Sequence, residues 1–161
     1  MTKAAESPNI LGRPRGVATA ALVIGGGVLE STIEFRARYS ETDQMGVVHH
    51  RHYLAWCEMG RTELIRQLGS SYAELESRGI FLAISEIRFS YRASARYDDL
   101  VRVRTTLEKL RSRGVRFSYL VESAETSAVL VRAETDHVCL DVEGSPRKLP
   151  ADTYELMKRA L

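Results

Sequence analysis

An acid, a glycine turn and a group of histidines lie close together in the sequence. Asp43 and His50 are seven residues apart, and Gly46 stands between them. An amphipathic segment, 54–68, follows at once. A turn that opens into a helix delivers a carboxylate, an imidazole and unpaired helix N–H groups to one small volume. These are the parts needed to hydrolyse an activated acyl group.

Length and composition are those of a small globular enzyme. A chain of 161 residues predicts one domain that is large enough to bury a core. The formal net charge of +2 gives no argument for nucleic acid, although the arginines gather in the middle of the chain, which suits a phosphate-bearing ligand. Cys57 and Cys139 stand in apolar surroundings without metal spacing, so we expect reduced core thiols and a cytoplasmic protein.

Residues 1–30 are expected to form an extension outside the folded domain. Residues 1–16 show proline, glycine and charge without periodicity, which is typical of disorder. Residues 17–29 are apolar and contain three successive glycines, so they resemble a signal peptide only faintly and are too short to span a membrane. We predict an unstructured extension or an over-long start, and a folded domain over 31–161.

The elements that must position the motif can be read from periodicity. Residues 32–39 alternate between apolar and charged side chains, which predicts a strand with Tyr39 on its apolar face. Apolar residues at helical spacing follow over 53–68, and Gly69 supplies a stop. A short helix with a serine cap is expected over 71–77.

The rest of the chain is expected to be mostly strand. The first strand covers 80–92, and its apolar phase shifts near Ser85, which predicts a bulge. A hairpin turn is expected over 111–114. The other elements are predicted as strands over 100–110, 115–122 and 129–142, and a terminal helix over 150–161.

One helix after the first strand, followed by an antiparallel meander, defines an α+β plan. A sheet of about five strands has two faces, and a single helix covers only one of them. Because the central helix is apolar on more than a narrow stripe, we expect the sheet to wrap around it. A second subunit would then cover the edge strands and the remaining sheet surface.

The sequence around Asp43 matches the motif of a known family. It reads Tyr39-x-Glu41-Thr42-Asp43-x-x-Gly46-Val47-Val48-x-His50-x-x-Tyr53-Leu54, with Glu58-x-x-Arg61-Thr62-Glu63 after it. This pattern closely resembles the acyl-CoA thioesterases of the hot-dog fold, with the 4-hydroxybenzoyl-CoA thioesterase and Tol–Pal-associated types as the nearest groups. The resemblance runs over 33–150. His49 and His52 depart from it, because the family often has an aromatic residue and an asparagine at these positions.

The resemblance implies that Asp43 is the central catalytic carboxylate. An ionised carboxylate can attack the thioester carbonyl to form a mixed anhydride, or it can deprotonate the water that attacks. An aspartate before a glycine turn is also a common turn or cap residue, so the whole motif favours catalysis more than Asp43 alone does. The sequence leaves the nucleophile and general-base roles both open.

His50 has three interpretations beside Asp43. Its ring could act as an acid or hydrogen-bond partner, its backbone N–H could matter more than the ring, or it could be an interface histidine. Family members with tyrosine here argue against an indispensable imidazole. Gly46 lets the backbone turn tightly beside the acyl group. The residues assigned to substrate binding in this segment are Gly46, Val47, Val48 and Tyr53.

A metal site is an alternative use of the three histidines beside Asp43. Zinc sites combine histidine with carboxylates, but side chains at i and i+1 diverge and no distant cluster supplies further ligands. We therefore expect neither a metal nor a cofactor. Glu58 and Glu63 are possible second carboxylates, but an ion pair of Glu58 with Arg61 and a solvated surface position for Glu63 are favoured.

Coenzyme A would need a narrow apolar slot for its pantetheine arm and basic residues at the mouth. Arg111 and Arg113 in the hairpin turn and Arg88 on the long strand are assigned to this role. Further candidates are Arg92 and the pair Arg147-Lys148. The alternative for each of them alone is a solvated basic face of the sheet.

We therefore expect a cytoplasmic hot-dog thioesterase that hydrolyses an acyl-CoA substrate. Two alternatives stay open: a polyketide-type thioesterase that acts on an acyl-carrier-protein chain, and a non-catalytic acyl-CoA-binding or scaffold protein. The resemblance also implies a homodimer that pairs again into a homotetramer, with Asp43 of one chain facing strand residues of the other. No nucleic acid and no membrane span are expected.

Overall fold

The structure, a computed structural model, describes residues 19–25 and 28–161, and the side chains from Leu29 onward. The expected disorder of residues 1–16 lies outside the described residues. The helices of the described part are α1 (Arg51–Gln67), α2 (Tyr72–Ser77) and α3 (Ala151–Lys158). None of them combines the length and the apolar character that crossing a membrane requires.

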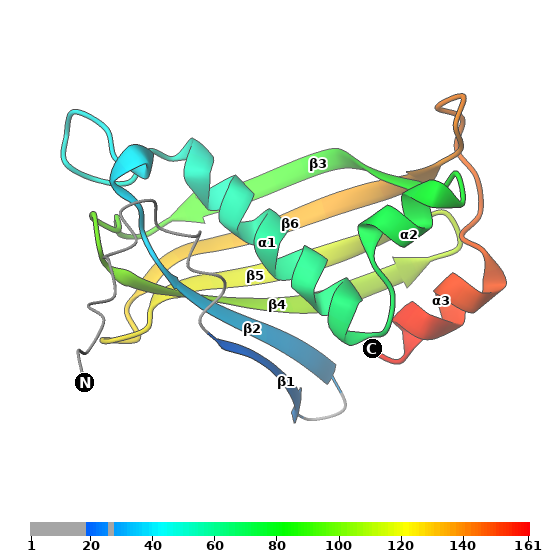
Figure 1. Cartoon of the computed structure of the whole chain (residues 1–161), viewed down its shortest axis with the longest axis horizontal. Coiled ribbons are helices and arrows are strands. Elements are labelled where there is room, and N and C mark those ends of the chain that lie inside the picture. Colours follow the sequence, from blue (N-terminus) through cyan, green and yellow to red (C-terminus); the bar gives the residue numbers. More distant parts are fainter. Residues whose placement is uncertain (1–18, 26–27) are drawn as a thin grey trace, which may run out of the picture.

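Six antiparallel strands form one sheet in the order β1-β2-β4-β5-β6-β3. The strands are β1 (Thr19–Gly25), β2 (Val28–Arg36), β3 (Phe81–Tyr91), β4 (Leu100–Arg111), β5 (Gly114–Ser123) and β6 (Val129–Leu140). Figure 1 shows the sheet curving around α1, which lies on its concave side. This is the α+β plan that the sequence predicts, with β1 and β3 as its edges.

The sixth strand, β1, corrects the predicted start of the sheet. The sequence places residues 1–30 in an extension, because residues 17–29 are apolar, rich in glycine and faintly similar to a signal peptide. In the structure β1 pairs with β2 from Thr19↔Glu34 to Gly25↔Val28, and β2 begins before the predicted residue 32. Backbone pairing with a neighbouring strand therefore makes a strand where periodicity gives no signal.

Most local predictions after this point are confirmed. Ser71 caps α2, since its Oγ accepts the Glu74 N–H at 3.1 Å, and the bulge in β3 lies between Ile84 and Glu86. The prediction for Tyr39 is wrong, because β2 has already ended and the residue lies in a 3-10 turn with 77% of its surface exposed.

Helix α1 can approach β4 closely because it carries a glycine at the contact. A Cβ at Gly60 would lie 2.3 Å from Thr105 Oγ1 and 3.2 Å from a methyl carbon of Val103. Such contacts are too short for any larger side chain without displacement of a neighbour. Further along the same face, the Trp56 ring packs edge-on against Phe35 with their centroids 5.3 Å apart. These contacts fix the middle of α1 over β2 and β4.

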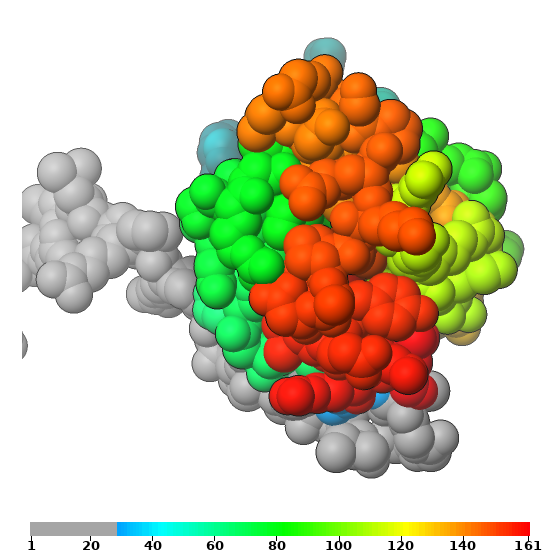
Figure 2. All heavy atoms as spheres, turned by 90° about the vertical axis from the view of Figure 1, so that its right-hand side faces the viewer, coloured from blue at the N-terminus to red at the C-terminus, as the bar shows by residue number. Residues whose placement is uncertain are grey.

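The C-terminal helix α3 and the segment before it close one end of the molecule. Figure 2 shows both lying across that end beside α2. Arg78, just after α2, forms an ion pair with Asp152 at 2.9 Å, and the Leu149 N–H donates to the Ser112 carbonyl at 2.8 Å. The terminal helix expected over 150–161 is therefore confirmed with slightly shorter bounds.

The two faces of the sheet differ in chemistry. Side chains on the inner face, such as Val103 and Phe117, are buried around α1. The outer face carries arginines that pair with acids directly opposite on neighbouring strands, and we call it the outer ion-pair face. Its opposed pairs are Arg102–Glu34, Arg116–Asp136 and Arg88–Glu134. Hydrogen bonds from the Arg116 guanidinium hold the pKa of Asp136 below its usual range.

Candidate active site

The turn that carries Asp43 is rigid. The Asp43 N–H donates to the Val47 carbonyl and the Gly46 N–H to the Asp43 carbonyl, both at 2.9 Å. Gly46 has a φ of +73°, a left-handed conformation that glycine adopts without strain. The Asp43 Oδ1 accepts the Met45 N–H at 2.8 Å. Its Oδ2 accepts no hydrogen bond from the described residues, so one oxygen anchors the carboxylate and the other can act.

The end of β3 and the loop after it hold this turn in place. The Val48 N–H donates to the Ala95 carbonyl at 2.8 Å, and the Ala95 N–H donates to the Tyr53 hydroxyl at 2.9 Å. The Tyr91 hydroxyl donates to the His50 carbonyl at 3.2 Å. The expected substrate-binding residues Val48 and Tyr53 are 3% and 2% exposed, and burial raises the pKa of the Tyr53 phenol. Both side chains therefore support the turn from below.

Two neighbouring histidines form the start of α1. The His49 Nδ1 accepts the Arg51 N–H at 3.3 Å, so His49 satisfies one of the free helix donors. His50 is the N-cap residue, its ring is exposed, and the two ring centroids lie 4.1 Å apart. The His50 N–H makes no hydrogen bond within the described residues. His49, which departs from the family motif, thus accepts the first N–H of α1, and the His50 N–H remains available as a donor.

The three assigned arginines are not gathered at Asp43 within one chain. Arg88 lies on the outer ion-pair face, 2.7 Å from Glu86 and 2.8 Å from Glu134. Arg111 and Arg113 border the turn after β4, whereas the Asp43 turn contacts the loop before β4. The 12 residues of β4 span about 40 Å at the usual rise of a strand, so these arginines lie at the opposite end of the sheet (Figure 1).

A basic hollow surrounds the turn between β4 and β5. Its volume is about 530 Å³, and its cationic lining is formed by Lys109, Arg111, Arg113 and Arg116. Glu86 and Asp136 also border it, but Asp136 is already bonded to Arg116. The hollow therefore retains positive charge that suits a phosphate group.

The structure adds two residues that the motif alone did not single out. Tyr91 holds the His50 carbonyl, and Arg96 reaches the Gly46 carbonyl with its Nη1 at 3.4 Å. Both lie within 33–150, the range over which the sequence resembles the family, and this resemblance is the only sequence signal for them. Glu41, the first acid of the motif, accepts the Trp56 indole N–H at 3.0 Å and is thus held by the core.

The helix glutamates differ from each other in their surroundings. Glu58 Oε2 lies 3.6 Å from Arg61 Nη2, which confirms the expected ion pair. Glu63 accepts bonds from Arg66 and Gln67 and its side chain is only 18% exposed, so the solvated position expected for it is wrong. No group of three or more potential metal ligands gathers within the described residues.

The inner face of β3 beside the turn is apolar and exposed. Ile84, Ile87 and Tyr91 are 37%, 45% and 49% exposed. Across the sheet Ile87 is opposite the buried Thr135 and Tyr91 is opposite the buried Val131, so these side chains point to the concave side. Helix α1 lies over β2 and β4 and leaves this strip, which we call the β3 inner strip, uncovered by the described chain.

Comparisons with known proteins agree with this arrangement. A family model described as the thioesterase-like superfamily matches residues 37–158. The acyl-CoA thioester hydrolase YbgC of Escherichia coli is 33% identical over 116 residues, which cover 71% of this chain and 86% of that protein. The chain belongs to the thioesterase-like superfamily.

Solved structures extend the likeness to the fold. Hypothetical protein TT1821 from Thermus thermophilus has a TM-score of 0.76 at 35% identity, covering 81% of this chain and 98% of that one. The DHNA-CoA thioesterase from Staphylococcus aureus has a TM-score of 0.77 at 30% identity, covering 81% and 89%. The protein is thus a thioester hydrolase with the expected α+β hot-dog fold.

Proposed function

We propose that this enzyme hydrolyses an acyl-CoA thioester to the free acid and CoA, with Asp43 as nucleophile or general base. The observation that carries the proposal is the Asp43 carboxylate: one oxygen accepts the Met45 N–H, and the other accepts no hydrogen bond from the part of the chain that the structure describes. It stands on a rigid turn directly before α1, where helix N–H groups favour negative charge. The relative YbgC of Escherichia coli is an acyl-CoA thioester hydrolase, which supports CoA as the leaving group.

The two routes use the same residues in different ways. As a base, Asp43 takes a proton from water, the water oxygen bonds to the carbonyl carbon, the C–S bond breaks, and Asp43 gives its proton to the departing CoA thiolate. As a nucleophile, the free carboxylate oxygen attacks the carbonyl carbon, CoA leaves, and water then cleaves the mixed anhydride. In either route the carbonyl oxygen gains negative charge, and the His50 N–H is the donor proposed to stabilise it.

A second subunit is proposed to complete the site. Gly114 pairs with Val138, and Val138 pairs with Ala83, so the turn before Gly114 lies near the start of β3. Tyr91, at the other end of β3, bonds to the His50 carbonyl next to the Asp43 turn. Antiparallel pairing of two β3 edges around a two-fold axis would therefore place the basic hollow of one chain near the Asp43 turn of the other. Arg111 and Arg113 of the second subunit would then hold the phosphates of CoA.

The exposed β3 edge supports a homodimer of this kind. β3 has backbone groups that no described strand pairs, and apolar side chains on its inner strip that water would otherwise surround. We propose that two such dimers pair again into a homotetramer in the cytoplasm, where the free thiols of Cys57 and Cys139 would stay reduced. Light scattering that shows a fully active monomer at micromolar concentration would contradict the shared site.

Thiol release from a panel of thioesters tests the proposed activity. The panel should include acyl-CoAs from acetyl to long-chain and aromatic, and the same acyl groups on an acyl carrier protein. Hydrolysis of the CoA thioesters supports the proposal. Hydrolysis of the carrier-protein thioesters alone identifies a polyketide-type thioesterase, and binding of acyl-CoA without thiol release identifies a binding protein.

A further inference from the structure

A charged side chain, Arg61, is buried between α1 and the inner face of the sheet. Its side chain is 9% exposed, its Nε donates to the Tyr72 hydroxyl at 3.2 Å, and its Nη2 lies 3.6 Å from Glu58. Its Nη1 is buried and has no hydrogen-bond partner among the described residues. Leaving a buried donor unpaired destabilises the protein, and more so on a charged group, so this position calls for an acceptor.

A chain of hydrogen bonds lies on the strands facing Arg61. The His137 Nδ1 is 3.3 Å from the Leu82 carbonyl, which can only accept, so Nδ1 carries the proton and Nε2 accepts from Thr135 at 2.9 Å. The Thr135 Oγ1 must then accept the Tyr119 hydroxyl proton at 2.8 Å. This order leaves the lone pairs of the Tyr119 oxygen free to accept a further hydrogen bond.

The ring of His137 is neutral in the folded protein. Burial, with the nearby charge of Arg61 as a second cause, lowers the pKa of His137 to about 4. Burial also raises the pKa of Tyr119, so its hydroxyl keeps its proton. The cluster therefore offers one charged donor, from Arg61, and one acceptor, from Tyr119, at neutral pH.

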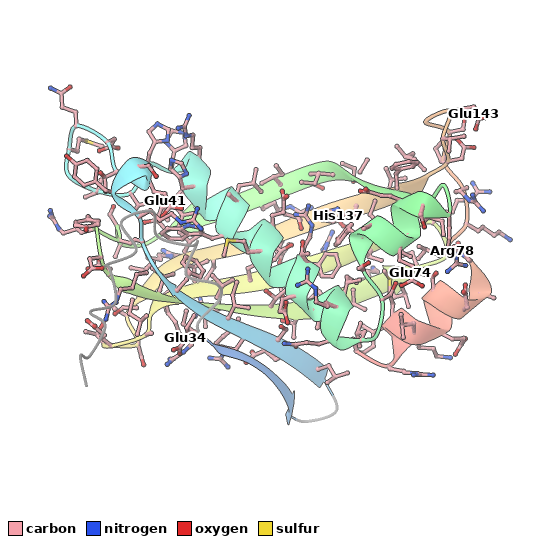
Figure 3. The ribbon with its side chains drawn as sticks, viewed as in Figure 1. Glu34, Glu41, Glu74, Arg78, His137 and Glu143 are labelled. Atoms are coloured by element: carbon pink, nitrogen blue, oxygen red, sulfur yellow. The ribbon has the colours of Figure 1, made fainter. Side chains whose placement is uncertain are left out.

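The cluster adjoins the β3 inner strip. His137 lies opposite Ile84 and Thr135 lies opposite Ile87, and both isoleucines are exposed. Figure 3 shows His137 between α1 and β3. Glu58, the partner of Arg61, has a side chain that is 61% exposed. Polar groups thus stand beside an apolar strip that a ligand can reach.

The distance between the proposed reaction centre and Arg61 is similar to the length of an acyl chain. Eleven residues of helix separate His50 from Arg61, which is about 16 Å at the usual rise, and four residues of strand separate Tyr91 from Ile87, about 13 Å. A thioester bound at the Asp43 turn could therefore lay its acyl group along the β3 inner strip and bring its far end to Arg61.

We propose that Arg61 and Tyr119 recognise an oxygen substituent at the far end of the acyl group. This proposal rests on the proposed function. A hydroxyl there would accept from Arg61 Nη1 and donate to the Tyr119 oxygen, and a carboxylate would accept from Arg61 alone. A plain hydrocarbon end would leave the buried donor unpaired, and the site therefore selects against it.

Matched thioesters of one chain length test the proposal. The kcat/KM is measured for octanoyl-CoA, ω-hydroxyoctanoyl-CoA and the mono-CoA thioester of octanedioic acid. We expect the enzyme to favour each oxygen-bearing substrate over octanoyl-CoA by ~10–100-fold, the effect of a hydrogen bond to a charged group. Equal kcat/KM values for all three would overturn the proposal.

Three variants separate specificity from stability. Arg61→Met should bring both ratios close to one while octanoyl-CoA is still hydrolysed, and Arg61→Lys should restore part of the preference for the carboxylate. Tyr119→Phe should lose the preference for the hydroxyl and keep that for the carboxylate. Arg66→Met, an exposed arginine on the same helix, is the matched control and should keep all ratios. Ratios unchanged in both Arg61→Met and Tyr119→Phe would contradict the assignment, and Tyr119→Phe alone decides if Arg61→Met does not fold.

Binding measurements keep this test distinct from the test of hydrolysis. If no thioester releases thiol, the proposed activity fails, but calorimetry with the same three CoA compounds still measures their relative Kd values. The proposal is supported without turnover if the native protein binds both oxygen-bearing compounds more tightly than octanoyl-CoA and Tyr119→Phe no longer prefers the hydroxyl compound. Equal Kd values in the native protein would reject it.

Discussion

The two sides of the sheet differ in how completely their polar groups find ion-pair or hydrogen-bond partners. On the outer ion-pair face, Arg88, Arg102 and Arg116 each have an acid opposite or beside them on a neighbouring strand. On the concave side and at the Asp43 turn, several groups lack a hydrogen-bond partner within the described residues, among them Asp43 Oδ2, the His50 N–H and Arg61 Nη1. We propose that the matched charges maintain the sheet, and that Asp43 Oδ2, the His50 N–H and Arg61 Nη1 face the substrate.

Replacing Asp43 by asparagine should have the largest effect on activity. Asparagine can still accept the Met45 N–H, so the turn and the melting temperature should change little. Charge and basicity are lost, so we expect kcat to fall by ~10²-fold or more, as when general acid–base groups are removed. Thiol-release kinetics with a melting curve measure both. Near-normal turnover in the folded variant would show that Asp43 is an ordinary turn residue and not a catalytic one.

The folded protein should become less stable as pH decreases, because His137 is buried in its neutral form. Its pKa is about 4 in the folded protein and 6.5 when unperturbed, so the unfolded chain binds the proton first as pH falls. Stability is then greatest above pH 6.5 and decreases down to pH 4, by up to about 3 kcal/mol. Urea unfolding across this range should show the slope, and His137→Gln should reduce it. A wild-type protein equally stable at pH 7 and pH 4.5 would contradict the burial of a neutral ring.

Substitutions of His50 should separate its ring from its backbone. His50→Tyr keeps a ring and a polar hydrogen and should retain more activity than His50→Ala, by about tenfold, which is less than the ~10²-fold or more expected for a general acid or base. The backbone N–H is present in both variants, so neither should reach the loss seen in Asp43→Asn. Equal and nearly complete inactivation of both variants would instead assign proton transfer to the imidazole. Steady-state kinetics over pH 5 to 9 make this measurement.

Replacing Arg88 should give the smallest effect of the four predicted changes. Its guanidinium is shared by Glu86 and Glu134 and is half exposed, so Arg88→Met should change stability by less than about 1 kcal/mol. We also expect kcat/KM to change by less than about threefold, because its charge is already compensated. A large rise in KM for acyl-CoA would show that Arg88 contacts CoA in the assembled enzyme. Arg111→Met in the basic hollow is the comparison variant.

The sequence predicts the site better than it predicts the charges around it. The Asp43 turn, the start of α1 and the bulge in β3 depend on neighbouring residues, and local patterns report them. The outer ion pairs depend on register, since Arg88 and Glu134 are 46 residues apart and meet only when β3 pairs with β6. The role expected for Arg88 therefore could not be checked against its partners before the fold was known.

Arg61 and β1 are two further features that local sequence patterns do not predict. Helical spacing predicts the ion pair of Arg61 with Glu58, but it does not predict that Tyr72 from α2 contacts the guanidinium and that the side chain is buried. Residues 19–25 have no strand periodicity, and their assignment to β1 comes from pairing with β2. Burial and pairing are produced by distant segments, so composition and spacing carry little information about either.

Binding of an acyl-CoA to Asp43→Asn tests the central claim most directly. If the unmatched oxygen of Asp43 acts on the substrate, the variant still presents the same turn, the same β3 inner strip and the same basic hollow. Calorimetry with a substrate that the native enzyme hydrolyses should then give a Kd within about threefold of the native KM under conditions of slow chemistry. A Kd weakened in proportion to the loss of turnover would contradict the account, because Asp43 would then shape the pocket rather than perform the reaction.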